Sequence, residues 1–243
     1  DMAQDYVKSL KKKYKNTSSG SKIVDAVLAL GSPFLVKTWK KLAPTALSMC
    51  GEKNINHLKD AMLLIEEEKI PGDFIEAGVW RGGLPIIMRA FLEQIGDKKR
   101  KVYLAYSFEG IPSNVSDPKD KAANIVLEPL KNLAVSKKQV EEAFNFFGLN
   151  DDQVVFLEGW FKDTLNQLPE TPIALARLDG DYYESTRDAI EALYPRLSIG
   201  GFIIIDYNLP LGCKKAVNEY RKKHNITEKI VKINKQSVYW RKS

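Results

Sequence analysis

The sequence has little cysteine, little histidine and no long apolar run. Its two cysteines, Cys50 and Cys213, lie far apart among 243 residues, so they predict no disulfide framework and favour a reducing compartment. No apolar stretch approaches the ~20 residues that a membrane span requires. The N-terminus is polar and rich in lysine, unlike the basic-then-apolar pattern of a secretory signal. These absences predict a cytoplasmic protein without a membrane partner.

Positive charge, at a net +6, is scattered along the chain and does not form a nucleic-acid-binding stretch. The densest cluster spans residues 8–22 and includes a segment of Asn, Thr, Ser and Gly. A solvated helix end explains this cluster, and an arm that binds polyanions is the alternative. No stretch combines basic with aromatic residues as RNA-binding motifs do. We therefore expect no nucleic-acid partner.

Regular α/β alternation begins after residue 72. Apolar runs predict five strands, at residues 73–78, 101–106, 154–157, 173–178 and 202–205. Helical patterns separate these runs, and segments 229–233 and 238–241 predict a closing β-hairpin. The pattern is that of a doubly wound, Rossmann-like α/β fold with a seven-stranded sheet and an antiparallel last strand.

The domain organisation follows from the same pattern. Residues 1–53 are expected to form an N-terminal helical cap, and residues 54–243 a single α/β domain. The polar stretch 113–128 interrupts the alternation, and its length favours a lid over a pocket. The chain begins with Asp1 and not with Met, which indicates a trimmed chain or a domain of a longer protein.

Two carboxylates follow predicted strands directly. Asp179 comes after the strand at residues 173–178, and Asp206 after the strand at residues 202–205. In an open α/β sheet, ligands bind beyond the carboxyl ends of the strands. A carboxylate next to a buried strand needs a partner, so this pair predicts a catalytic base or a divalent cation site. For Asp181, two residues after Asp179, the alternative to a ligand role is to cap the N-terminus of the helix that follows.

A glycine-containing loop follows the first predicted strand. It reads Glu76-x-Gly78-x-x-x-Gly82, and it is not the G-x-G-x-x-G dinucleotide fingerprint because no Gly occupies the first position. Glycines allow the backbone to approach a ligand closely, and the acidic residue can accept hydrogen bonds from it. The spacing matches the acidic loop of S-adenosylmethionine (SAM) enzymes, and a tight turn without a ligand is the alternative.

These motifs together resemble the macrocin and mycinamicin type of sugar O-methyltransferases. The matching pieces are Pro71 to Gly83, Asp151 to Val154, Gly159 to Thr164, Asp179 to Thr186 and Val238 to Arg241. The resemblance implies a class I SAM-dependent methyltransferase fold, a homo-oligomer and a small-molecule acceptor with a free hydroxyl group. It also implies a Mg²⁺ ion that binds two adjacent sugar hydroxyls and so lowers the pKa of the one to be methylated.

The resemblance also implies the site residues. Asp179 and Asp206 match two of the family's metal ligands and are expected to be the catalytic residues as well. Asn208 is expected as the third metal ligand through its carbonyl oxygen, one position after the place of the family's third acidic ligand. The cofactor-binding residues are Glu76, Gly78, Gly82, Tyr106, Ser107, Gly159, Trp160 and Asp179.

Two positions depart from the family pattern. Tyr106 stands where the family has the aspartate that grips the ribose of SAM, and Tyr207 where it has the second of two adjacent aspartates. A phenol cannot accept two hydrogen bonds from a diol as a carboxylate does. The sequence therefore predicts a SAM-dependent O-methyltransferase of a sugar or other natural-product intermediate, and a divergent relative that no longer methylates is the alternative. Mg²⁺ is uncertain because one anionic ligand is missing.

Overall fold

The computed structural model describes residues 47–112, 115, 117–118, 120–121, 134–207 and 211–243. Most of the predicted helical cap, most of the predicted lid and Asn208 lie outside these residues, so they stay predictions. The division of the chain near residue 53, the homo-oligomer and the cytoplasmic location stay predictions too. No helix within the described part of the chain is long and apolar enough to cross a membrane.

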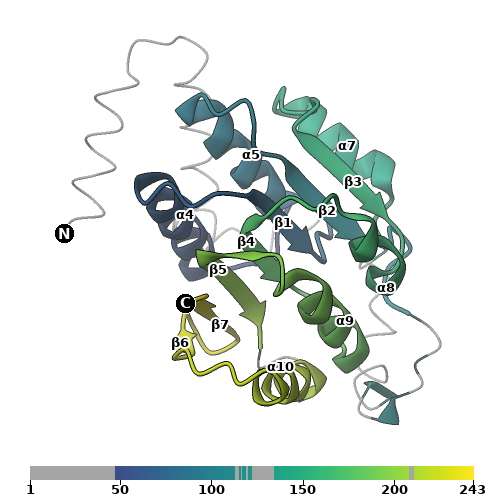
Figure 1. Ribbon diagram of the computed structural model, residues 1–243. Coiled ribbons are helices and arrows are strands. Elements are labelled where there is room, and N and C mark those ends of the chain that lie inside the picture. Colours follow the sequence, from purple (N-terminus) through teal and green to yellow (C-terminus); the bar gives the residue numbers. More distant parts are fainter. Residues whose placement is uncertain (1–46, 113–114, 116, 119, 122–133, 208–210) are drawn as a thin grey trace.

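A seven-stranded sheet forms the centre of the molecule, with the strand order β3-β2-β1-β4-β5-β7-β6 (Figure 1). Strands β1 to β5 pair in parallel, whereas β7 is antiparallel to both β5 and β6. The strands are β1 Asp73–Ala77, β2 Val102–Tyr106, β3 Val154–Glu158, β4 Ile173–Leu178, β5 Leu197–Asp206, β6 Val231–Lys232 and β7 Ser237–Arg241. The predicted fold, including the antiparallel last strand, is confirmed.

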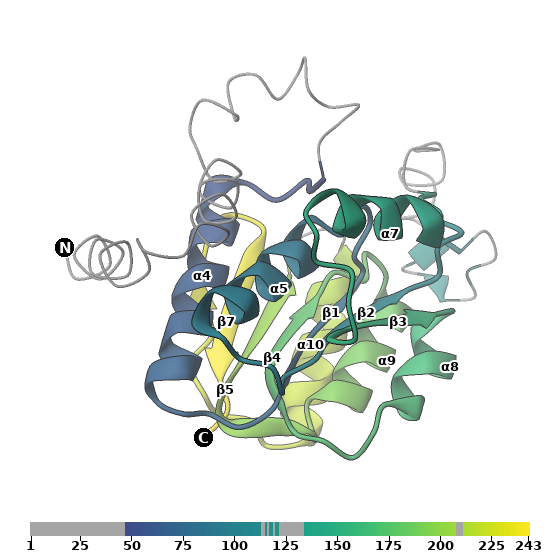
Figure 2. The same ribbon diagram turned by 90° about the horizontal axis from the view of Figure 1, so that it is seen from above.

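Helices cover both faces of the sheet (Figure 2). One face carries α4 Glu52–Glu67, α5 Gly83–Ile95 and α7 Lys137–Phe146. The other carries α8 Phe161–Thr164, the 3₁₀ helix η2 Leu165–Gln167, α9 Tyr183–Leu193 and α10 Leu211–Lys223. Because both faces are covered, the central strands are buried on both sides, which is why they read as continuous apolar runs.

Element ends differ from the prediction mainly around glycines. β5 begins at Leu197, five residues before the predicted start, because Gly200 and Gly201 continue the ladder with β7: the Gly200 N–H donates to Lys242 O at 2.7 Å. Gly200 has φ of 79°, a conformation that only glycine adopts easily, so the pair makes an irregularity inside the strand. The short helices α8 and η2 were not predicted, since each is too short to show a period.

Candidate active site

A pocket of about 260 Å³ opens at the carboxyl ends of β1, β2, β4 and β5. Loops after these strands form its wall, as expected for ligand binding in an open α/β sheet. The residues of the sequence prediction that line it are Gly78, Tyr106, Ser107, Gly159, Trp160, Asp179 and Asp206. Two others, Glu76 and Gly82, do not line it. The structure therefore brings most of the predicted site to one edge of the sheet.

The two glycines of the acidic loop have packing roles. A Cβ atom on Gly78, which has φ of 100°, would lie 2.0 Å from the carbonyl oxygen of Asp179. Gly78 therefore lets the ends of β1 and β4 approach each other at the pocket wall. A Cβ atom on Gly82 would lie 2.7 Å from Cγ1 of Val140, so this glycine faces α7 and not the pocket. Gly82 does not line the pocket, and the cofactor role predicted for it stays a prediction.

Ser107 shapes the loop after β2. Its hydroxyl donates to the carbonyl oxygen of Gly110 at 2.7 Å and accepts from the N–H of Glu109 at 3.2 Å. Because both hydrogen bonds stay within the loop, Ser107 holds the turn that carries Gly110 along the pocket wall. The cofactor contact predicted for Ser107 stays a prediction.

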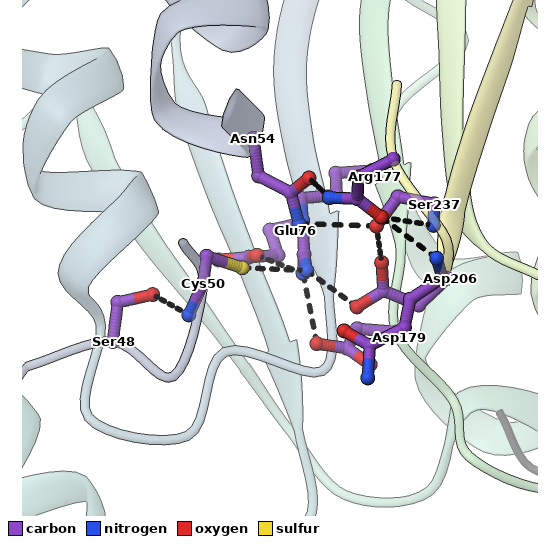
Figure 3. Close-up of polar contacts among 10 residues, drawn as sticks. Ser48, Cys50, Asn54, Glu76, Arg177, Asp179, Asp206 and Ser237 are labelled. Carbon is purple, nitrogen blue, oxygen red and sulfur yellow. Dashed lines mark hydrogen bonds and ion pairs between the residues drawn. The ribbon is translucent and has the colours of Figure 1, made fainter. Parts of the chain in front are cut away.

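Arg177 is the site residue that the sequence analysis missed. It lies on β4, its side chain is only 3% exposed, and its guanidinium reaches three carboxylates (Figure 3). Nη1 donates to Glu76 Oε1 at 2.5 Å and to Asp179 Oδ2 at 3.0 Å. Nη2 donates to Asp206 Oδ2 at 2.8 Å and to Cys50 Sγ at 3.0 Å. The sequence does show a charged residue inside an apolar strand. Because a buried charge requires partners, this position could have pointed to the carboxylate cluster.

Asp206 is held from a second direction as well. Its other oxygen, Oδ1, accepts a hydrogen bond from the hydroxyl of Ser237, which is fully buried at the start of β7. The side-chain amide of Asn54, on α4, donates to that same Ser237 hydroxyl at 3.0 Å. Figure 3 shows this chain of contacts entering the carboxylate cluster from the side of the C-terminal hairpin. Both oxygens of Asp206 therefore have protein partners.

Three carboxyl groups contact one guanidinium in this cluster, so negative charge is in excess when all three are ionised. Burial raises the pKa of Glu76 to about 7, against the lowering effect of Arg177. Burial and then the neighbouring Asp206 raise the pKa of Asp179 well above its ordinary value, although 28% of its side chain is exposed to the pocket. The same two causes raise the pKa of Asp181 to about 6. A cationic ligand in the pocket would relieve this excess of negative charge.

Tyr106 and Tyr207 stand where aspartates were expected, and their side chains point to different parts of the structure. Tyr106 lines the pocket, with its ring edge-on to Phe108 at 5.5 Å between centroids. Burial, with Asp181 and Asp179 nearby, raises its pKa, so it stays a neutral phenol. Tyr207 packs in the core on the side of α9 and α10, where its hydroxyl donates to Asn218 Oδ1 at 2.7 Å.

The predicted metal ligands do not form a metal site in this geometry. Asp179 and Asp206 each accept a hydrogen bond from Arg177, Tyr207 faces α10, and Asn208 lies outside the described residues. Across the described residues no group of three His, Cys, Asp or Glu side chains is placed to hold a metal ion. The residues present therefore do not fit a divalent cation.

Comparisons with known proteins identify the family. The family model described as macrocin O-methyltransferase matches residues 1–242. An 8-demethyl-8-(2,3-dimethoxy-alpha-L-rhamnosyl)-tetracenomycin-C 4'-O-methyltransferase of Streptomyces olivaceus is 44% identical over 208 residues, which are 85% of this chain and 78% of that protein. A mycinamicin III 3''-O-methyltransferase of Micromonospora griseorubida is 43% identical over 82% of this chain and 79% of its own.

A solved structure agrees with these relatives. The O-methyltransferase NovP superposes with a TM-score of 0.78 and 39% identity, over 82% of this chain and 83% of that one. The match of fold and sequence extends over most of the chain. The chain therefore belongs to the macrocin O-methyltransferase family.

Proposed function

We propose that this protein transfers a methyl group from SAM to a hydroxyl group on the sugar of a natural product, in the pocket at the carboxyl ends of β1, β2, β4 and β5. The observation that carries this proposal is the position of that pocket, together with the carboxylates Asp179 and Asp206 on its wall. The named activities of the relatives support it, since two of them methylate sugar hydroxyls of glycosylated natural products.

The chemistry of the pocket wall suits SAM. Asp179, Asp181 and Asp206 line the pocket, and the positive charges of a sulfonium and an ammonium group bound beside them would favour their ionised forms. Trp160 and Phe161 provide apolar surface against which an adenine ring can pack. In this proposal Gly78 and Gly159 leave room for the cofactor, and Tyr106 offers its hydroxyl to the ribose in place of a carboxylate.

When bound, SAM supplies an electrophilic methyl group on a sulfonium. The protein must bring an acceptor hydroxyl next to it and take up the hydroxyl's proton. Asp179 is suited to accept that proton, because its carboxylate faces the pocket and is oriented by Arg177. Orientation of two reactants in one pocket is worth ~7–11 kcal/mol in favourable cases, so most of the rate enhancement is expected from positioning.

Calorimetric titration with S-adenosylhomocysteine (SAH) tests the cofactor part of the proposal. We expect micromolar affinity for the unaltered protein and a loss of at least about tenfold for Trp160→Ala, which removes the ring beside the pocket. Phe146→Ser, on the exposed surface of α7, is the matched control and should leave the affinity unchanged. No binding by the unaltered protein, with binding restored by Tyr106→Asp, would instead support the divergent relative that no longer methylates.

A methylation assay tests the rest. The protein is incubated with SAM and a panel of glycosylated natural products that carry free sugar hydroxyls, and the products are analysed by mass spectrometry. A mass increase of one CH2 unit in an acceptor, which results from replacement of a hydroxyl hydrogen by a methyl group, supports the proposal if it is lost in Asp179→Asn. SAH binding without methylation of any sugar acceptor would contradict the acceptor class and leave the cofactor part standing.

A further inference from the structure

We infer that the guanidinium of Arg177, and not a divalent metal ion, is the cation that the pocket carboxylates Asp179 and Asp206 hold. The geometry of the cluster is independent of SAM. The inference rests on the proposed function only where it says which hydroxyl groups the acceptor must carry.

The guanidinium lies between the two carboxylates. It donates one N–H to Asp179 Oδ2 at 3.0 Å and another to Asp206 Oδ2 at 2.8 Å. A metal ion that bridged these two oxygens would have to take the position that the guanidinium holds. Arginine stays protonated at any pH at which the protein is folded, so this positive charge is permanent.

Arg177 is buried and is held by protein contacts on more than one side of the cluster. Its side chain is 3% exposed, and the remaining contacts, to Glu76 Oε1 at 2.5 Å and to Cys50 Sγ at 3.0 Å, hold it from the opposite side. Displacing it would leave Glu76, itself fully buried, without its charged partner. Removing one member of a buried ion pair leaves the other charge without compensation in the interior and is strongly destabilising. Binding of a divalent cation in place of the guanidinium would have to offset that loss.

Among the described residues, the remaining oxygens around Asp179 and Asp206 offer too few ligands for a divalent cation. Asp206 Oδ1 accepts from the Ser237 hydroxyl, and the side chain that follows Asp206 in sequence is the phenol of Tyr207, which is hydrogen-bonded to Asn218. Mg²⁺ requires near-octahedral oxygen coordination and is usually held by one or two carboxylates that are free to bind it. Here neither Asp179 nor Asp206 has both oxygens available.

This arrangement changes what the acceptor must provide. A metal ion can chelate two adjacent hydroxyls, whereas a guanidinium has only N–H donors, and here both Nη groups already donate to protein acceptors. Arg177 is therefore a positioning residue, which orients Asp179 and Asp206 toward the pocket. On the proposed function, an acceptor with one suitably placed hydroxyl is sufficient, and a vicinal diol is not required.

Titration with Mn²⁺ alone tests the inference directly. Free Mn²⁺ is measured by electron paramagnetic resonance while the full chain is added, for the unaltered protein and for Asp206→Asn. We expect the same curve for both, without saturable binding at millimolar Mn²⁺. Saturable binding by the unaltered protein that Asp206→Asn removes would overturn the inference.

Removal of the guanidinium gives the complementary result. Arg177→Gln should gain a Mn²⁺ site, because the two carboxylates lose their resident cation, and the double variant Arg177→Gln/Asp206→Asn should lose it again. Arg187→Gln, in an exposed ion pair with Asp188, is the matched control and should gain no site. A folded Arg177→Gln protein that gains no site would contradict the role of Arg177. If this variant does not fold, the comparison of unaltered protein with Asp206→Asn still decides.

SAH titration of the same samples keeps this test separate from the proposed function. We expect the SAH affinity of the unaltered protein to be the same in EDTA and in excess Mg²⁺. SAH binding together with Asp206-dependent Mn²⁺ binding would overturn this inference and leave the proposed function intact. Absence of SAH binding would contradict the proposed function, and the Mn²⁺ result would still decide between the two cations.

Discussion

Asp120 caps helix α9 across 63 positions of sequence. Its carboxylate accepts the backbone N–H of Tyr183 at 2.5 Å and that of Glu184 at 3.0 Å, and the residue is fully buried. The helix has no cap of its own, since the N-cap residue Tyr182 makes no side-chain hydrogen bond to it. Because α9 begins directly after the pocket residues Gly180 and Asp181, this contact fixes the end of the pocket wall.

Asp120→Ala is expected to lower the free energy of unfolding by about 1–2 kcal/mol, the usual cost of losing an N-cap carboxylate. The measurement is urea denaturation followed by circular dichroism. Asp152→Ala, which removes an exposed carboxylate from the turn before β3, should change the stability by less than about 0.5 kcal/mol. Equal effects of the two substitutions would show that the Asp120 contact does not hold the helix.

Gly78→Ala should be more damaging than an ordinary substitution at a glycine with positive φ. Gly96, at the C-terminus of α5, has φ of 74° and no atom near the position of a Cβ, so Gly96→Ala should cost about 1–2 kcal/mol from its backbone conformation alone. At Gly78 the added Cβ would also meet the Asp179 carbonyl oxygen at 2.0 Å, which forces β1 and β4 apart.

Thermal unfolding and SAH titration separate the two glycine variants. We expect Gly96→Ala to lower the melting temperature and keep the SAH affinity, since it lies away from the pocket. Gly78→Ala should lower the melting temperature further and weaken SAH binding at least about tenfold, because the pocket wall moves. A Gly78→Ala protein as stable as Gly96→Ala would mean that the close approach of the two strands is not required.

The fold could be predicted from the sequence because its strands are buried on both faces. The predicted strand at residues 173–178 matches β4 residue for residue, and the antiparallel pairing of β6 with β7 follows from the hairpin pattern. The site was predicted only in part. Asp179 and Asp206 follow strands and so have a local signal, whereas the hydrogen bond from Ser237 to Asp206 joins residues 31 positions apart and has none.

The role of Arg177 could not be predicted from the local sequence pattern alone. It lies in an apolar run, and its two-residue spacing from Asp179 on one strand puts both side chains on the same face of the sheet. The spacing of Arg177 and Asp179 is visible in the sequence. The other two partners of Arg177, Glu76 at β1 and Asp206 at β5, are brought next to it only by the order of the strands in the sheet. Gly82 is the opposite case: its sequence spacing fits a cofactor-binding loop, but in the structure it packs against α7 and does not line the pocket.

His57 should make the protein less stable as the pH falls. Burial lowers the pKa of its imidazole to about 4, and Nε2 has no hydrogen-bond partner in the described residues. The unfolded chain binds a proton near pH 6.5 and the native protein only near pH 4. The stability contributed by the neutral ring is thus complete above about pH 6.5 and is lost as the pH falls toward about 4.

His57→Phe removes this contribution and keeps an aromatic ring against Tyr239 and Phe202. Between about pH 7.5 and 4.5, the free energy of unfolding should fall by about 1–2 kcal/mol less in the variant than in the unaltered protein, allowing for partial solvent access. Urea titrations at several pH values measure this difference. Parallel pH profiles for the two proteins would show that His57 does not titrate differently in the native and unfolded states.

The direction of the Tyr207 side chain can be tested by a double-mutant cycle with Asn218. The hydroxyl donates to Asn218 Oδ1 at 2.7 Å, so Tyr207→Phe should cost about 0.5–1.5 kcal/mol and show little further loss when Asn218→Ala is added. Neither variant should alter SAH affinity, because the ring faces the core beside α10. Additive losses, or a change in SAH binding, would place the tyrosine elsewhere.

Ser237→Ala removes the donor that holds Asp206 from the hairpin side. The hydroxyl is fully buried and its acceptor is charged, so the expected loss of unfolding free energy is about 1.5–3 kcal/mol. Ser198→Ala is the matched control: its hydroxyl donates to the Pro71 carbonyl oxygen at 2.6 Å on the exposed surface, and its loss should cost about 0.5–1.5 kcal/mol. The difference measures how tightly β7 holds the carboxylate. Equal losses would mean that Arg177 alone fixes Asp206, and the C-terminal hairpin would then have no part in building the pocket.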